Sequence, residues 1–184
     1  MPDHDYLDRV LIGGRKPVDR VPLVRYDPAW PERYERERRR LATVLGPVAV
    51  AIEHIGSTAV PGLIAKAIID ICVLVPDVEE ELAYDAPLMA AGYALRVKEA
   101  GHRMYRTGAL DVQIHIYSFG SPEIEAYLLF RDRLRADPQD RDLYARTKEE
   151  LSGRAWDDMN YYAQAKGPVI QEILARARAS ATPL

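Results

Sequence analysis

The chain has 184 residues, 48% hydrophobic and 29% charged, with a formal net charge of −3, which predicts a single soluble domain with its own core. That charge excludes the strongly basic class, and no apolar run approaches the ~20 residues of a membrane span, so neither nucleic acid nor a membrane is expected as a partner. One cysteine excludes an internal disulfide framework and, with a start unlike a secretory signal, favours the cytoplasm.

The chain divides into an N-terminal arm and one domain. Residues 1–22 are polar and are expected to form a loosely held arm, in which 11–12 and 21–24 can dock as short extended pieces. Residues 23–184 are expected to form the domain. Its sheet region covers residues 23–120 and its helical region covers residues 121–184.

Proline, glycine and hydrophobic periodicity mark the elements of the sheet region. A helix is predicted from Pro31, which suits a first helical turn, to the stop at Gly46. A second helical pattern over 78–91 is interrupted by Pro87, which either begins a new segment or kinks the helix. Valine and isoleucine content or alternating polarity predicts strands over 48–55, 67–75, 93–98, 102–107 and 110–117. The last three strands are expected to form an antiparallel meander.

The last third of the chain is expected to be helical. Ser121 and Asp137 each precede a proline, a pattern typical of a helix N-cap. The final helix, from about Arg154, contains Gly167 and Pro168, so a break or bend is predicted there. Strands followed by helices predict an α+β fold, in which a mixed β-sheet has flanking helices and a helical C-terminal part.

The turn between the first two predicted strands is the most informative stretch, residues 54–62. Gly56 lets backbone approach a ligand closely, because it has no Cβ atom. Ser57 and Thr58 can donate hydrogen bonds to phosphate oxygens. Asp70 lies inside the apolar second strand, where a carboxylate costs free energy unless it is paired or binds a metal. A small-residue turn followed by an acidic strand predicts a site for a polyphosphate and Mg²⁺.

These residues resemble the GrpB-like family, a branch of the nucleotidyltransferase-fold superfamily. The resemblance extends from about Val24 to Lys166 and includes residues 128–132 and the strand around His115. It implies a nucleotidyltransferase-like mixed sheet, Mg²⁺-dependent handling of a nucleotide, and transfer of a nucleotidyl group. Because similar proteins occur fused to dephospho-coenzyme A kinase, it also implies a functional link to that enzyme.

Three positions depart from the pattern of the family. Cys72 stands two residues after Asp70, where active transferases carry a second acid. Ala67 stands where the family usually has proline, and Gln113 where a second histidine is expected. The missing second acid leaves open whether the site is catalytic.

Strand alternation groups the candidate catalytic residues. Asp111 and His115 share one face of their predicted strand, and Asp70 meets them if the polar faces of the two strands lie on the same side. Asp70 is the expected metal ligand, with Asp111 the best-placed second ligand. His115, and His54 before the turn, are candidate catalytic acids or bases. Glu53 is a further candidate ligand, but alternation lets only one of Glu53 and His54 face the site.

Basic residues are the candidates for holding phosphate. Lys66 lies in the loop before the Asp70 strand, within reach of a phosphate bound at the turn. The resemblance adds Lys166, which matches a lysine of the family's last helix, with Tyr162 on the same helical face. Arg103 and Arg106 on the meander are further candidates.

Three functions remain open at this point. The first is a Mg²⁺-dependent nucleotide-binding protein that acts as a nucleotidyltransferase on an unidentified acceptor. The second is a non-catalytic module that binds a nucleotide or a phosphorylated metabolite, with coenzyme A metabolism as a plausible setting. The third is a metal-dependent phosphohydrolase that uses His54, Asp70 and His115. A zinc site built from those three residues and Cys72 is chemically conceivable.

Overall fold

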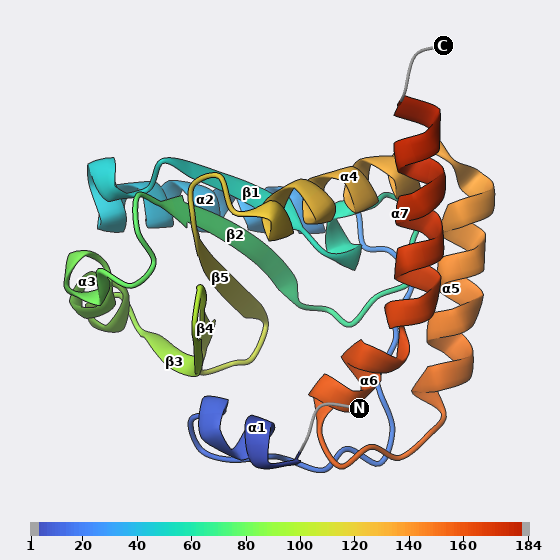
Figure 1. Cartoon of the computed structure of the whole chain (residues 1–184), viewed down its shortest axis with the longest axis horizontal. Helices are drawn as coiled ribbons and strands as arrows, with labels where there is room; N and C mark the ends of the chain where they lie inside the picture. The colour runs from blue at the N-terminus through green and yellow to red at the C-terminus, as the bar shows by residue number, and fades with distance from the viewer. Residues whose placement is uncertain (1–3, 182–184) are drawn as a thin grey trace.

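The computed structural model describes residues 4–181, so residues 1–3 of the predicted arm and 182–184 of the predicted domain lie outside the described residues. Its centre is a five-stranded sheet (Figure 1) in the order β1-β2-β5-β4-β3. The strands are β1 (Ala51–Ile55), β2 (Ile69–Val75), β3 (Tyr93–Glu99), β4 (His102–Thr107) and β5 (Val112–Ser118). β2 and β5 run parallel, and the other neighbouring pairs run antiparallel. The predicted mixed sheet and antiparallel meander are therefore confirmed.

Side chains of β2 alternate between two apolar layers. Ile71 and Val73 face the main core, which also contains Trp30 of α2 (Trp30–Leu45) and Leu88 of α3 (Asp85–Ala90). Cys72 and Leu74 face the other side, where they pack under Ile124 of α4 (Pro122–Ala136). Asp70 has the same parity as Cys72, so its carboxylate lies on the α4 side of the sheet.

The helices begin and end where local signals predict. α2 starts at Trp30 with proline in its first turn and ends at Gly46, which has a positive φ of 53°. The 78–91 segment is a 3₁₀ turn (Glu81–Ala83) followed by α3, in which Pro87 occupies the first turn, where no intrahelical N–H is needed. The predicted final helix is broken as expected, into α6 (Met159–Ala165) and α7 (Gly167–Ala181).

The C-terminal helices form a layer at one end of the sheet. α5 (Pro138–Ser152) and α7 lie side by side there, and α4 connects them to the sheet (Figure 1). Leu134, Tyr144 and Ile173 from these three helices pack with Val60 and Leu63 of the loop after β1. The helical layer thus packs directly against the loop that contains the Gly56-Ser57 turn. No helix among residues 4–181 is both long and apolar enough to span a bilayer.

The N-terminal segment is packed against the domain, in contrast to the expected loosely held arm. α1 (His4–Val10) buries Leu7 against Val97 and Tyr161. The guanidinium of Arg96 donates hydrogen bonds to the carbonyl oxygens of Ile12 and Gly14. The expected extended pieces are present as isolated bridges, Leu11 with Val97 and Val24 with Ala65. Sequence polarity missed this docking because a short helix can dock through very few apolar side chains, here the buried Leu7 and the partly buried Val10.

An ion-pair cluster around the buried Asp140 connects three of the C-terminal helices. Asp140, on α5, accepts hydrogen bonds from Arg133 Nε of α4 at 2.6 Å and from Arg176 Nε of α7 at 2.9 Å. Burial by itself would raise the pKa of Asp140, but the hydrogen bonds from Arg176 and Arg133 outweigh it and lower the pKa below the usual 3.8. The ionised Asp140 carboxylate therefore stabilises the folded protein fully at pH values above the usual pKa of 3.8. This stabilisation is lost as the pH falls through the lowered pKa.

Replacing Asp140 by asparagine is expected to lower the free energy of unfolding by about 2 kcal/mol at neutral pH, because the ion pairs with both arginines are lost and an amide NH2 group replaces one acceptor oxygen. Urea unfolding at several pH values measures this effect. The difference from wild type should shrink as the pH is lowered below about 4. Asp132→Asn, which alters an exposed ion pair with Arg131, is the control and should change stability by less than about 1 kcal/mol. A pH-independent penalty at Asp140 would contradict the assignment.

Candidate functional site

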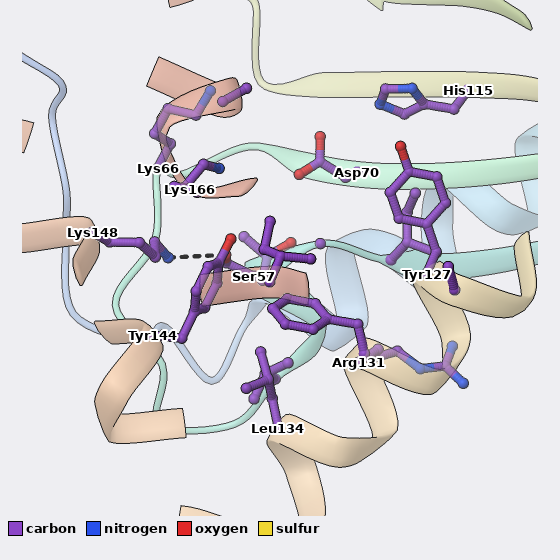
Figure 2. Close-up of a pocket in the computed structure, with 18 of the residues that line it drawn as sticks. Ser57, Lys66, Asp70, His115, Tyr127, Arg131, Leu134, Tyr144, Lys148 and Lys166 are labelled. Atoms are coloured by element: carbon purple, nitrogen blue, oxygen red, sulfur yellow. Dashed lines mark hydrogen bonds between the residues drawn. The ribbon is translucent and has the colours of Figure 1, made fainter. Parts of the chain in front are cut away.

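A cavity of about 460 Å³ lies between the α4 side of the sheet and the C-terminal helices (Figure 2). This volume is in the range of small-molecule sites. We call the cavity the central pocket. Its polar lining residues come from the turn, the sheet and the helices, and they include Ser57, Thr58, Lys66, Asp70, Gln113, His115, Arg131, Lys148 and Lys166. Its apolar lining comes mainly from α4, α5 and α7 and includes Phe130, Leu134, Tyr144, Ile170 and Leu174.

Gly56 and Asp70 form the floor of the central pocket. Ile55, the last residue of β1, pairs with Asp70 at the start of β2. Gly56 follows with φ 71° and ψ −172°, a combination that essentially requires glycine. A Cβ atom added there would lie 2.5 Å from Oδ2 of Asp70. The close approach that the glycine permits is therefore to the Asp70 carboxylate, which it lets lie against the turn.

Three lysines surround this carboxylate from different parts of the chain. Lys66 precedes β2, Lys148 lies on α5, and Lys166 lies at the junction of α6 and α7. Figure 2 shows the three lysines together beside Asp70. Lys148 is 2% exposed, and its Nζ donates hydrogen bonds to Ser57 Oγ at 2.9 Å and to the carbonyl oxygen of Ile64. The arrangement places an excess of positive charge around one acid.

Burial shifts the pKa values of these groups toward their neutral forms. It lowers the pKa of Lys148 to about 7, with Lys166 and Lys66 adding repulsion, and that of Lys166 to about 8. The pKa of Lys66 is also lowered, chiefly by burial. Burial raises the pKa of Asp70, and the three lysines partly offset that rise. Such a pocket gains most from a ligand that brings several negative charges.

Aromatic rings support two of the lysines. Lys166 Nζ lies 4.8 Å from the centre of the Tyr162 ring, so the predicted pairing of these residues is confirmed, and Lys148 Nζ lies 5.3 Å from the Tyr144 ring. Sequence reasoning did not select Lys148 or Tyr144. Their i,i+4 spacing on α5 was the available signal, but an exposed lysine on a solvated helix gives the same signal.

His115 lies in the central pocket, whereas His54 does not, so the prediction that His54 faces the same site as Asp70 is wrong. Ile55 has the pocket-facing parity on β1, so its neighbour His54 points to the opposite face, where its ring stacks on Tyr34 with centroids 4.5 Å apart. Its Nε2 contacts Thr58 Oγ1 at 3.1 Å, and burial lowers its pKa to about 4. The Thr58 hydroxyl itself donates to the carbonyl oxygen of Ile68.

Asp111 is also wrong as a metal ligand in the pocket. It does not line the central pocket, and its carboxylate pairs with Arg33 of α2 at 3.0 Å and accepts a hydrogen bond from Thr107 Oγ1 at 2.7 Å. β5 begins at Val112, so strand alternation does not extend to the preceding loop residue. Asp111 therefore turns toward α2 on the opposite side of the sheet from His115.

The other residues expected to bind a metal or a phosphate interact with other parts of the protein. Glu53 pairs with Arg131 at 3.0 Å. Cys72 is fully buried in an apolar cluster, and burial raises the pKa of its thiol to about 12. Arg103 pairs with Glu79 and Glu81, away from the pocket, and Arg106 does not line it either.

No cluster of three or more histidine, cysteine or acidic side chains able to hold a metal occurs in residues 4–181. The zinc site considered above is therefore wrong, because His54 and Cys72 do not reach the pocket. Two acidic residues among those described line the pocket, Asp70 on its floor and Glu123 of α4.

The sheet order and the helical layer define a nucleotidyltransferase-like fold. Solved structures of this class superpose on the chain: the GLD-2/RNP-8 complex matches with a TM-score of 0.55 at 14% identity, over 82% of this chain and 60% of that one. At that identity the likeness shows the fold alone. The crystal structure of the conserved protein GrpB from Enterococcus faecalis matches with a TM-score of 0.70 at 31% identity, over 85% of this chain and 96% of that one.

Residues 20–176 match the family described as GrpB protein, and the chain belongs to this family. A UPF0157 protein of Streptomyces coelicolor is 49% identical over 170 residues, 92% of this chain and 90% of that protein. A protein of Mycobacterium tuberculosis named dephospho-CoA kinase is 32% identical over 197 residues, which cover 89% of this chain and 48% of that protein. The similarity to the kinase is therefore confined to about half of its length.

Proposed function

We propose that the central pocket binds a nucleotide or a related polyphosphate. The observation that carries this proposal is the group of three lysines around the Gly56-Ser57 turn, with Lys148 held on Ser57 Oγ. Ammonium groups that lie close together, one of them buried and two partly buried, repel one another and gain from phosphate oxygens, which accept charge-assisted hydrogen bonds. The apolar lining on α4 and α7 offers a surface for the non-phosphate part of the ligand.

The donor set fits Mg²⁺ that arrives with the ligand. Asp70 supplies one hard carboxylate oxygen on the pocket floor, and Mg²⁺ commonly uses one or two carboxylates together with substrate phosphates and waters. The ion would neutralise phosphate charge when bound. The role of the lysines is to hold the terminal phosphates, and that of Gly56 is to keep the Asp70 carboxylate against the turn.

Transfer of a nucleotidyl group to an acceptor is the reaction we assign first, on the strength of the fold class together with a histidine, His115, in the same pocket as Asp70. The lysines would stabilise the charge that develops on the leaving pyrophosphate. The match with part of a dephospho-CoA kinase makes coenzyme A precursors the first acceptors to test.

A non-catalytic binding module is the second candidate, and a specific observation favours it. The two expected replacements for a second acid, Asp111 and Glu53, are paired with Arg33 and Arg131, and Cys72 is buried in an apolar cluster. Pyrophosphate release from nucleoside triphosphates, measured over a broad panel of acceptors, separates the two functions. Release that depends on His115 and Asp70 supports transfer, and binding without any release supports the module.

Asp70→Asn is expected to remove the Mg²⁺-dependent part of stabilisation by a nucleotide while leaving the ligand-free protein folded. A ligand at about 100 times its Kd stabilises a protein by about 2.7 kcal/mol, which a thermal-shift assay with ATP, with and without Mg²⁺, detects. Asp111→Asn is the matched control, because this acid lies outside the pocket, and it should respond like wild type. If no nucleotide or coenzyme A precursor raises the melting temperature, or if Asp70→Asn responds like wild type, the site assignment fails.

A further inference from the structure

A chain of hydrogen bonds runs from the end of β3 into the central pocket through two histidines. Oε1 of Glu99 lies 2.7 Å from Nδ1 of His102, and Nε2 of His102 lies 3.0 Å from Nδ1 of His115. The two imidazole rings are within 8° of parallel with centroids 5.2 Å apart. A centroid distance of 5.2 Å together with a nitrogen–nitrogen distance of 3.0 Å means that the two rings meet edge to edge in nearly one plane. This is the geometry of a hydrogen bond between two imidazoles.

The donors and acceptors along this chain can be assigned from its outer end. The Tyr6 hydroxyl donates to Oε2 of Glu99, and a carboxylate can accept hydrogen bonds on both of its oxygens. Nδ1 of His102 must then carry the proton that Oε1 accepts. In a neutral His102, Nε2 is an acceptor, and it requires a proton on Nδ1 of His115. The ring nitrogen of His115 that remains for the pocket, Nε2, therefore has a free lone pair.

We propose that Glu99 and His102 are positioning residues that hold His115 in the tautomer whose Nε2 faces the central pocket, where it accepts a proton from the bound ligand or acceptor. This inference rests on the proposed function in one respect, that a ligand with an ionisable O–H or N–H group occupies the pocket. With His102 neutral, the tautomer itself follows from the hydrogen bonds and needs no ligand.

Every proton that moves in the proposed transfer has a donor and an acceptor among the ligand, His115 and His102. The O–H or N–H bond of the ligand breaks and leaves its electron pair on the ligand, and a bond forms from that proton to His115 Nε2. The Nδ1–H bond of His115 then breaks, and its proton passes to Nε2 of His102. The positive charge finishes on His102, between the Glu99 carboxylate and the Tyr117 ring, which stacks on His102 with centroids 4.6 Å apart.

The surroundings of His115 explain why the positive charge should move from His115 to His102. Burial, together with His102 and Lys66, lowers the pKa of His115 to about 3, so an imidazolium at this position is strongly disfavoured. The other ionisable groups near these histidines that line the pocket are Asp70, Tyr127 and Glu123, and the Glu123 carboxylate interacts electrostatically with His102. A lone histidine there would be a weak proton acceptor, whereas one coupled to His102 and Glu99 delivers the charge away from the lysines.

Nitrogen-15 NMR of the full chain tests the tautomer directly. The sequence contains four histidines, so long-range proton–nitrogen correlations can be assigned one imidazole at a time. In the ligand-free wild type near neutral pH, we expect His115 to be neutral and protonated on Nδ1. His102→Phe keeps a ring against Tyr117 but removes the acceptor, and His115 should then populate both tautomers. His4→Phe, at a histidine bonded to Tyr161 instead, is the control and should leave the His115 signals unchanged.

Two results would overturn the proposal. One is a wild-type His115 protonated on Nε2 while His102 is neutral, and the other is a folded His102→Phe protein whose His115 signals match wild type. The wild-type measurement decides the matter even if His102→Phe does not fold. Failure of nucleotides to bind would refute the proposed function but not the tautomer, so the two failures are distinguishable.

Discussion

Replacing Gly56 by alanine is expected to destabilise the protein by about 3 kcal/mol and to abolish ligand binding in the central pocket. The backbone at Gly56 has φ 71° and ψ −172°, which L residues adopt only with strain of about 1–3 kcal/mol. The new Cβ would also lie 2.5 Å from Oδ2 of Asp70 and 3.0 Å from its Cβ, so the carboxylate must move. Both effects act at the floor of the pocket, because Gly56 directly follows the residue paired with Asp70.

Chemical denaturation and nucleotide titration measure the two effects separately. Gly62→Ala is the matched control, because Gly62 has a similar φ of 80° in the same loop but a Cβ atom added there would meet no neighbouring atom within 4 Å. It should show backbone strain without loss of binding. Adding Asp70→Ala to Gly56→Ala should recover part of the stability, because the clashing group is gone, yet no binding. Equal effects of Gly56→Ala and Gly62→Ala on binding would show that contact with Asp70 is unimportant.

Lys148→Met is expected to weaken nucleotide binding about 30-fold at neutral pH, since a charge-assisted hydrogen bond is worth about 2 kcal/mol. Methionine keeps most of the side-chain volume against Tyr144 but cannot donate to a phosphate or to Ser57 Oγ. Isothermal titration calorimetry measures the affinity. Lys98→Met, at a half-exposed lysine paired with Glu81 away from the pocket, is the control and should bind like wild type.

The lowered pKa values of Lys148 and Lys166 predict how ligand binding depends on pH. The pKa of Lys148 in the free pocket is lowered to about 7 and that of Lys166 to about 8, so both lose protons as the pH rises from 7 to 9. Binding of a phosphate favours the charged ammonium and must then be accompanied by proton uptake, so the affinity of wild type should fall across this range. Calorimetry in buffers with different ionisation enthalpies detects the uptake. A wild-type affinity that is flat from pH 7 to 9, or as steep in Lys148→Met, would contradict the role of Lys148.

Local signals in the sequence were sufficient to predict the strands, the helices that follow the N-terminal segment, and the position of the turn, whereas helix α1 was missed. Pro31, Gly46 and Gly167 act on the backbone of their own segment, so the start of α2, its end and the break before α7 were predictable without any tertiary contact. The Gly56-Ser57 turn and Asp70 were found in the same way. They belong to consecutive strands that pair with each other, and Asp70 pairs with Ile55 beside the turn.

The side of the sheet that each candidate faces depended on tertiary contacts. Alternation fixes relative parity along a strand, but the absolute face depends on where pairing with the neighbouring strand begins. His54 lies one residue before the pocket-facing Ile55, and Asp111 lies one residue before β5, and each points to the α2 side. His54 has the opposite parity to the pocket-facing Ile55, and Asp111 lies in the loop before β5, where alternation no longer applies, so both predictions were wrong although the strands themselves were correct.

The positive charge of the pocket was likewise set by packing. Lys148 meets Ser57 across 91 positions of the chain, and Glu99, His102 and His115 are aligned by the register of β3, β4 and β5. In the sequence, a lysine on a polar helix and a histidine at a strand start look like solvated side chains. Their properties come from burial beside one another, and burial exists only once the helical layer has closed over the sheet.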